Sequence, residues 1–213
     1  MNKPAVDFNL YLITDRKNTR GGEISFVVEE ALRGGVKMVQ LREKDLSSRD
    51  LYATACEMRK LTSRYGARLC INDRIDIALA VDADGVHLGN SSIPVSRARN
   101  ILGEKRLIGV SCHDTASAID AQEKGADFIT FGPVFYTSSK AAFGNPVGVG
   151  KLGDITRLLR IPVFALGGVT RENVPRVIEA GAYGIALISA VMAADDPREE
   201  TKSLLSSLPA RED

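Results

Sequence analysis

Eight short runs of apolar, mostly β-branched residues, separated by longer amphipathic stretches, limit this chain to few folds. The runs cover residues 10–14, 38–41, 68–71, 85–88, 107–110, 128–131, 163–166 and 184–188. Each run is almost continuously apolar, which is typical of strands that are covered on both faces of a parallel sheet. The segments between them predict helices, among them 26–33, 48–65, 116–123 and 174–179. The alternation of strand and helix predicts an α/β fold.

Glycines at the ends of the predicted helices support this alternation. Gly34-Gly35, Gly125 and Gly181 each stand shortly before a predicted strand, where glycine supplies a left-handed helix C-cap. A βα unit that repeats eight times predicts a closed (β/α)8 TIM barrel, with an open doubly wound sheet as the alternative. No linker or low-complexity tract divides the chain, so we expect a single barrel domain over residues 1–213.

Composition narrows the classes of partner. The net charge of +1 provides no basic field for nucleic acid. No apolar segment approaches the about 20 residues that cross a bilayer, so we expect no membrane partner, and we see no signal peptide. Three cysteines without a Cys-x-x-Cys spacing predict reduced thiols in a cytoplasmic protein. The sequence leaves the oligomeric state open, a homo-oligomer included.

Basic residues follow the second predicted strand. In barrels of this kind the chemistry lies where strands end and the following loops begin. Alternation along an extended chain places Gln40, Arg42 and Lys44 on one side, and Leu41 and Glu43 on the other. An arginine and a lysine that converge suit a polyanion such as diphosphate. The alternative is an outward ion pair between Glu43 and Arg42 or Lys44.

The pair Asn72-Asp73 follows the third predicted strand and has two interpretations. Asp73 can cap a helix over residues 75–81, a common position for aspartate. Alternatively its carboxylate is a ligand for Mg²⁺ that bridges the protein to a diphosphate. These residues leave both interpretations open.

Two histidines and a cysteine are candidates for acid–base or nucleophilic chemistry. His87, near the end of the fourth predicted strand, is a candidate acid or base, but we favour a hydrogen-bonded structural role. Cys112 and His113 are adjacent in sequence, and neighbouring strand residues point in opposite directions. Because no third orienting group is evident, we reject a thiol nucleophile there.

Loops after the sixth, seventh and eighth predicted strands supply further anion-binding groups. The long sixth loop contains Thr137, Ser138, Ser139 and Lys140, which suit an anion clamp or a mobile lid; an ordinary surface loop is the alternative. Gly167-Gly168 with Thr170 follows the seventh strand, and Ile188-Ser189 ends the eighth. Glycines with a nearby hydroxyl at this position match the phosphate site of such barrels.

Several of these segments together resemble one superfamily over nearly the whole chain. They are Tyr11-Leu-Ile-Thr-Asp15, Gln40-Leu-Arg-Glu-Lys44, Ile71-Asn-Asp73, Gly85-Val-His-Leu-Gly89, Gly109-Val-Ser-Cys-His113, Gly132-Pro-Val-Phe, Gly167-Gly168 and Ile188-Ser189. In combination they resemble the thiamin phosphate synthase family and its relative, the thiazole tautomerase family. The synthases, transferases of thiamine biosynthesis, join hydroxymethylpyrimidine diphosphate to thiazole phosphate and release diphosphate with Mg²⁺.

The resemblance implies a role for each matching residue. The pyrimidine diphosphate would be held by Gln40, Arg42, Lys44, Asn72, Ser111 and Lys140. Among these, the catalytic groups would be Arg42, Lys44, Ser111 and Lys140. The thiazole phosphate would be held by Thr137, Ser139, Gly167, Ile188 and Ser189. Asp73 would bind Mg²⁺.

Two positions differ between the branches of this superfamily. Ser92 stands where the synthases usually carry a second aspartate ligand for Mg²⁺, and a hydroxyl is a weaker ligand than a carboxylate. Pro133 stands where tautomerases place a histidine, as it does in the synthases. We therefore expect a synthase, with a tautomerase-like enzyme and a non-catalytic, thiazole phosphate-binding regulatory barrel as alternatives.

Overall fold

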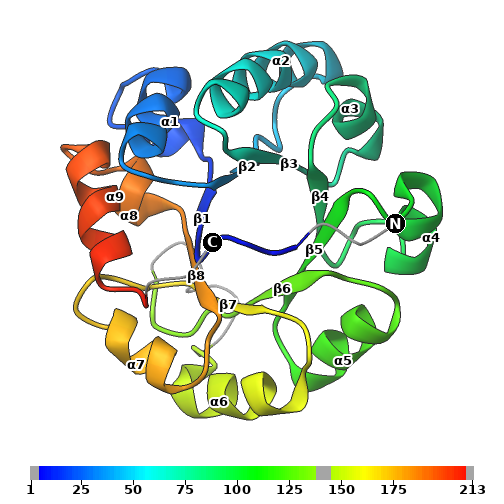
Figure 1. Cartoon of the computed structure of the whole chain (residues 1–213), viewed down its shortest axis with the longest axis vertical. Helices are drawn as coiled ribbons and strands as arrows, with labels where there is room; N and C mark the ends of the chain where they lie inside the picture. Colours follow the sequence, from blue (N-terminus) through cyan, green and yellow to red (C-terminus); the bar gives the residue numbers. More distant parts are fainter. Residues whose placement is uncertain (1–4, 138–144, 210–213) are drawn as a thin grey trace.

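Eight parallel strands close a barrel in sequence order, with β1 paired to β8 (Figure 1). The computed structural model describes residues 5–137 and 145–209. The strands are β1 (Leu10–Ile13), β2 (Met38–Leu41), β3 (Arg68–Asn72), β4 (Gly85–Leu88), β5 (Leu107–Cys112), β6 (Phe128–Phe131), β7 (Val163–Leu166) and β8 (Gly184–Leu187). This confirms the predicted (β/α)8 barrel, because in an open sheet β1 and β8 would not pair with each other.

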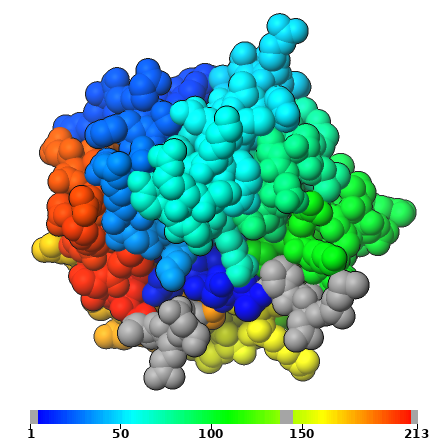
Figure 2. All heavy atoms as spheres, turned by 45° about the horizontal axis from the view of Figure 1, so that its top comes forward, coloured from blue at the N-terminus to red at the C-terminus, as the bar shows by residue number. Residues whose placement is uncertain are grey.

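Helices surround the barrel and form its outer wall. They are α1 (Ile24–Arg33), α2 (Ser48–Arg64), α3 (Ile75–Ala80), α4 (Val95–Leu102), α5 (Thr115–Glu123), α6 (Gly148–Leu158), α7 (Val174–Glu179), α8 (Ser189–Met192) and α9 (Pro197–Ser206), with a short 3-10 helix η1 (Arg16–Asn18). Helix α2 lies between α1 and α3, and α9 packs beside α1 (Figure 2). Within the described residues, no helix has the length and apolar character needed to cross a bilayer.

The glycines before the strands adopt the predicted conformation with one exception. Gly35, Gly125 and Gly181 have φ angles of +109°, +97° and +86°, which favour glycine at a helix end. Gly34, the first glycine of its pair, has φ −73°, so the left-handed conformation expected at Gly34-Gly35 falls on Gly35 alone. A Cβ at Gly34 would lie 2.7 Å from the Thr201 Cβ on α9, so close helix packing requires this glycine.

Aromatic side chains close the amino-terminal mouth of the barrel. The segment before β1 crosses this mouth (Figure 1), and Phe8 from it is buried. The Phe8 ring stacks on Phe164 with the centroids 5.1 Å apart and meets Phe128 edge-on at 5.6 Å. Ligands are therefore left with the opposite end, where the strands finish.

Two matched ion pairs join strands at the amino-terminal end. Asp127 precedes β6 and accepts a hydrogen bond from Arg99 at 2.5 Å. Asp84 precedes β4 and accepts one from Arg59 at 2.6 Å. Each carboxylate also accepts a backbone N–H of the preceding strand, at 2.7 Å in both cases. Each ion pair thus links a helix to two neighbouring strands.

Candidate active site

Several cavities open among the loops that follow the strands, and two of them bear on the two predicted anion sites. The first has a volume of about 250 Å³ and is lined by Leu41, Glu43, Lys44, Leu46, Leu51, Asn72, Asp73, Arg74, Gly89, Ser91 and Ser92. The second has a volume of about 440 Å³ and is lined by His113, Gly132, Pro133, Tyr136, Thr137, Leu166, Gly167, Gly168, Val169, Thr170, Ala186, Leu187, Ile188, Ser189 and Ala190. We call them the first and the second cavity.

The first cavity brings together Lys44, Asn72 and Asp73, three of the predicted site residues. Asp73 has φ +64°, a left-handed conformation that is uncommon outside glycine and concentrates at functional sites. Helix α3 starts after Arg74 and has no side-chain cap, so the interpretation of Asp73 as its cap is wrong. The Asp73 carboxylate forms no hydrogen bond or ion pair with any described residue and is exposed at the cavity.

The two basic side chains that line the first cavity differ in their partners. The Arg74 guanidinium binds Asp76 at 2.6 and 2.9 Å and Ser48 at 3.0 Å. Lys44 is exposed and forms no hydrogen bond or ion pair within residues 5–137 and 145–209. Lys44 therefore remains available to a bound anion.

A chain of hydrogen bonds joins two more of the predicted residues, Gln40 and Ser111, through the barrel interior. Gln40 Nε2 donates to the Tyr11 hydroxyl at 2.9 Å, and this hydroxyl lies 3.3 Å from His87 Nδ1. His87 Nε2 lies 3.0 Å from Ser111 Oγ, which also accepts from Thr130 at 3.4 Å. The sequence did not predict the roles of Tyr11 and Thr130, although each carries a hydroxyl in an otherwise apolar strand.

Burial keeps His87 neutral within this series of hydrogen bonds. Desolvation, followed by the positive charge of Arg42, lowers the pKa of His87 to about 3. Both ring nitrogens already have partners. This supports the structural interpretation of His87 over general acid–base catalysis.

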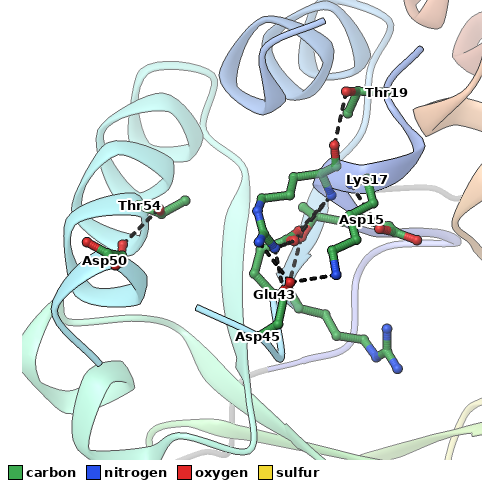
Figure 3. Close-up of polar contacts among 10 residues, drawn as sticks. Asp15, Lys17, Thr19, Glu43, Asp45, Asp50 and Thr54 are labelled. Atoms are coloured by element: carbon green, nitrogen blue, oxygen red, sulfur yellow. Dashed lines mark hydrogen bonds and ion pairs between the residues drawn. The ribbon is translucent and has the colours of Figure 1, made fainter. Parts of the chain in front are cut away.

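Glu43 does not pair with Arg42 or Lys44, so the outward ion pair considered from the sequence is wrong. Its carboxylate is buried and binds Thr14 and Arg16 at the end of β1 (Figure 3). The Arg42 side chain, like that of Lys44, forms no hydrogen bond or ion pair with the described part of the chain. The two bases are thus free of the acid that lies between them in sequence.

The second cavity contains the described part of the predicted monophosphate site: Thr137, Gly167, Ile188 and Ser189. The predicted residues Ser138, Ser139 and Lys140 lie outside the described residues.

Backbone conformation and close packing both require glycine at positions 167 and 168 in this cavity. Gly167 and Gly168 have φ angles of +94° and +64°. A Cβ on Gly167 would lie 2.6 Å from the Pro133 Cβ, and one on Gly168 would lie 2.5 Å from the Tyr136 carbonyl oxygen. The loop after β6 thus packs directly against this glycine pair, a contact that the sequence did not reveal.

The adjacent Cys112 and His113 point to different surroundings. Cys112 is a buried free thiol, and burial raises its pKa to about 12, so the thiol stays protonated. His113 donates from Nδ1 to the Gly132 carbonyl and lines the second cavity. Their separation supports the rejection of a thiol nucleophile.

Cavities at the carboxyl ends of a closed eight-stranded barrel lie where enzymes of this fold have their active sites. The family model described as thiamine monophosphate synthase, TMP-TENI, matches residues 10–191. The chain belongs to this family and is accordingly an enzyme of the transferase class.

Curated relatives and a solved structure agree with this assignment. The chain is 58% identical to a "putative thiamine-phosphate synthase" of Geobacter sulfurreducens, over 97% of both chains. It is 44% identical to the thiamine-phosphate synthase of Clostridium novyi, over 93% of this chain and 98% of the relative. The structure of a thiamine phosphate pyrophosphorylase from Pyrococcus furiosus superposes with a TM-score of 0.86 at 39% identity, over 94% of this chain and 95% of the other.

Proposed function

We propose that this chain is a thiamin phosphate synthase that condenses hydroxymethylpyrimidine diphosphate with thiazole phosphate and releases diphosphate. The observation that carries this proposal is the convergence of Lys44, Asn72 and Asp73 on the first cavity, while Gly167 and Ser189 line the second. Two anion sites at one end of a barrel suit a reaction between two phosphorylated substrates. The relatives named as synthases favour this function over the tautomerase-like and regulatory alternatives.

In the proposed complex the diphosphate occupies the first cavity. The side chains of Lys44 and Arg42, which form no hydrogen bond or ion pair with a described residue, would contact its oxygens, and Asn72 would donate from its amide. The pyrimidine ring would lie against Gln40 and Ser111, whose positions are fixed through Tyr11 and His87. We propose that Lys140 adds a third positive charge.

The residues of the first cavity fit Mg²⁺ as a cofactor. Mg²⁺ is commonly held by one or two carboxylates together with substrate phosphates and water. Asp73 offers an exposed carboxylate that forms no hydrogen bond or ion pair with a described residue. Ser92 Oγ accepts the Gly89 N–H at 2.8 Å and contributes at most a neutral oxygen. We propose that Asp73 holds the ion, which when bound spreads the negative charge of the diphosphate.

The bond between the pyrimidine methylene carbon and the diphosphate oxygen breaks, and the thiazole nitrogen forms the new bond to that carbon. Arg42 and Lys44 stabilise the leaving diphosphate as its negative charge develops. The second cavity orients the thiazole phosphate through Gly167, Ser189 and Thr137, and we propose that Ser138 and Ser139 add hydroxyls. No protein nucleophile is required, in keeping with the protonated Cys112 thiol.

A single assay tests the proposed function. The purified chain is mixed with hydroxymethylpyrimidine diphosphate, thiazole phosphate and Mg²⁺, and thiamin phosphate is measured by chromatography. We expect product that depends on both substrates and falls when Mg²⁺ is chelated. The absence of product above background would refute the synthase. Proton exchange at the thiazole carbon in that case would point to the tautomerase-like alternative.

We also propose a cytoplasmic location, since Cys56, Cys70 and Cys112 are free thiols.

A further inference from the structure

Four consecutive residues that follow β2 alternate in charge: Arg42, Glu43, Lys44 and Asp45. Glu43 and Lys44 among them line the first cavity. Neighbouring opposite charges readily pair with one another at a protein surface. Such pairing would neutralise both bases that the proposed site offers to a diphosphate. The two acids do not pair with these bases. Both instead bind cationic residues of another segment, the turn that follows β1.

Glu43 is the buried member of this arrangement, with a side chain only 2% exposed. Its Oε1 accepts the Thr14 hydroxyl at 2.7 Å and the Arg16 backbone N–H at 3.1 Å. Its Oε2 accepts the Arg16 Nη1 at 3.1 Å. Figure 3 shows these contacts converging on the carboxylate. A carboxylate with this many donors has little left to offer a neighbouring lysine or arginine.

Asp45 is held by the same arginine. Arg16 Nη1 and Nη2 bind its two oxygens at 2.5 and 2.9 Å, and Lys17 Nζ lies 2.6 Å from Oδ2 (Figure 3). The bonds from Arg16, and then from Lys17, hold the pKa of Asp45 well below its usual range. Arg16 therefore binds both acids of the alternating segment.

Thr14 fixes the backbone between the two bases. The last backbone hydrogen bond between the ends of β1 and β2 joins Thr14 N to Gln40 O at 2.9 Å. The Thr14 hydroxyl continues this pairing, since it accepts the Arg42 backbone N–H at 2.9 Å while it donates to Glu43. This buried hydroxyl thus sets the direction of the chain from Arg42 to Lys44.

We propose that Arg16 and Thr14 are positioning residues of the diphosphate site. Arg16 withdraws Glu43 and Asp45 from Arg42 and Lys44, and Thr14 holds the strand end that presents the two bases. Neither residue needs to touch substrate. This inference rests on the proposed function, because it assigns the diphosphate of the pyrimidine substrate to Arg42 and Lys44.

The test separates the two substrates. For wild type and Arg16→Met, the KM of each substrate is measured in the thiamin phosphate assay, and the Kd of inorganic diphosphate with Mg²⁺ is measured by calorimetry. We expect Arg16→Met to raise the KM for pyrimidine diphosphate and the Kd for diphosphate by about tenfold or more, since tenfold corresponds to the loss of one modest charge interaction. The KM for thiazole phosphate should stay within about twofold.

Arg106→Met provides the matched control. Arg106 is also a partly exposed arginine in an ion pair, with Asp82 at 2.7 Å, but it lies at the amino-terminal end of the barrel. This variant should leave both KM values unchanged. Equal rises in both KM values for Arg16→Met, or no change in the diphosphate Kd, would overturn the proposal.

Thr14 gives a second test in case Arg16→Met does not fold. Thr14→Ser keeps the hydroxyl and should match wild type, whereas Thr14→Val keeps the shape and should reproduce the selective rise in KM. Identical behaviour of the two variants would contradict the role of the hydroxyl. If wild type itself makes no thiamin phosphate, the proposed function fails, and the diphosphate Kd still decides the positioning role of Arg16 and Thr14.

Discussion

The two ends of this barrel use charge in opposite ways. At the amino-terminal end, Asp127 and Asp84 are each bound by an arginine and by a strand N–H. At the carboxyl end, the side chains of Lys44 and Asp73 line a cavity and form no hydrogen bond or ion pair with the described residues. Phe8 closes one end, and the first and second cavities open at the other.

The difference indicates which charges stabilise the fold and which serve ligands. A charge saturated by protein donors contributes to folding but has no capacity left for substrate. A charge without protein partners gains its partner from the ligand, at little cost to the fold. Arg16 belongs to the carboxyl end but behaves like the amino-terminal arginines, since Glu43 and Asp45 saturate it. The following predictions test this division.

The largest effect on stability is expected at the amino-terminal end. Asp127→Ala leaves the largely buried Arg99 guanidinium without its anion, and should lower the free energy of unfolding by about 3 kcal/mol or more. Urea denaturation measures this loss. Asp154→Ala, which breaks an exposed pair with Arg157, should change stability by less than ~1 kcal/mol. Comparable losses for the two variants would contradict the distinction.

Lys44→Ala should show the opposite pattern. We expect kcat/KM for pyrimidine diphosphate to fall about 100-fold or more, as for the loss of a charge-stabilising donor in an active site. The unfolding free energy should change by less than ~0.5 kcal/mol, because Lys44 is exposed. Steady-state kinetics and urea denaturation of the same preparation measure both. A stability loss as large as that of Asp127→Ala would show that Lys44 stabilises the fold and would contradict its assignment to the ligand.

Between the two ends, His87 should make stability depend on pH. Its pKa is about 3 in the folded chain, against 6.5 ordinarily, so below pH 6.5 the unfolded chain binds a proton that the folded chain refuses. Wild type should therefore lose up to about 1.4 kcal/mol per pH unit from this group as pH falls from 6.5 toward 5. Urea denaturation of His87→Gln across that range should give a shallower slope. An unchanged slope would mean that His87 is charged in the folded chain.

The smallest effect is expected from Ser92→Asp. A carboxylate beside Asp73 would add a second charged ligand, and should lower the Mg²⁺ concentration for half-maximal rate by about tenfold, or ~1.4 kcal/mol. A Mg²⁺ titration of the synthase rate measures this shift. If the apparent Mg²⁺ affinity does not change, Ser92 does not occupy a ligand position.

The barrel and much of its site were predictable because they depend on periodic patterns. Apolar runs mark the strands, and glycines mark the ends of the helices before them. The carboxyl ends of parallel strands lie together, which brings Lys44, Asn72 and Asp73 to one cavity. The direction of Glu43 was not predictable, since it depends on Thr14 and Arg16 from a different strand.

Contacts across the barrel interior could not be predicted from the sequence either. Tyr11 meets His87 because strands distant in sequence face one another inside a closed barrel. Similarly, Gly34 is glycine because α9 returns to pack on it, a contact between segments far apart in the chain. Local patterns carry no information on such pairings.

Diffraction from crystals soaked with hydroxymethylpyrimidine diphosphate and Mg²⁺ would test the account most directly. We expect the diphosphate in the first cavity, in contact with Lys44 and Arg42, with the metal ion on Asp73 and the ring beside Gln40 and Ser111. Diphosphate bound in the second cavity, against Gly167 and Ser189, would contradict the assignment of the two anion sites.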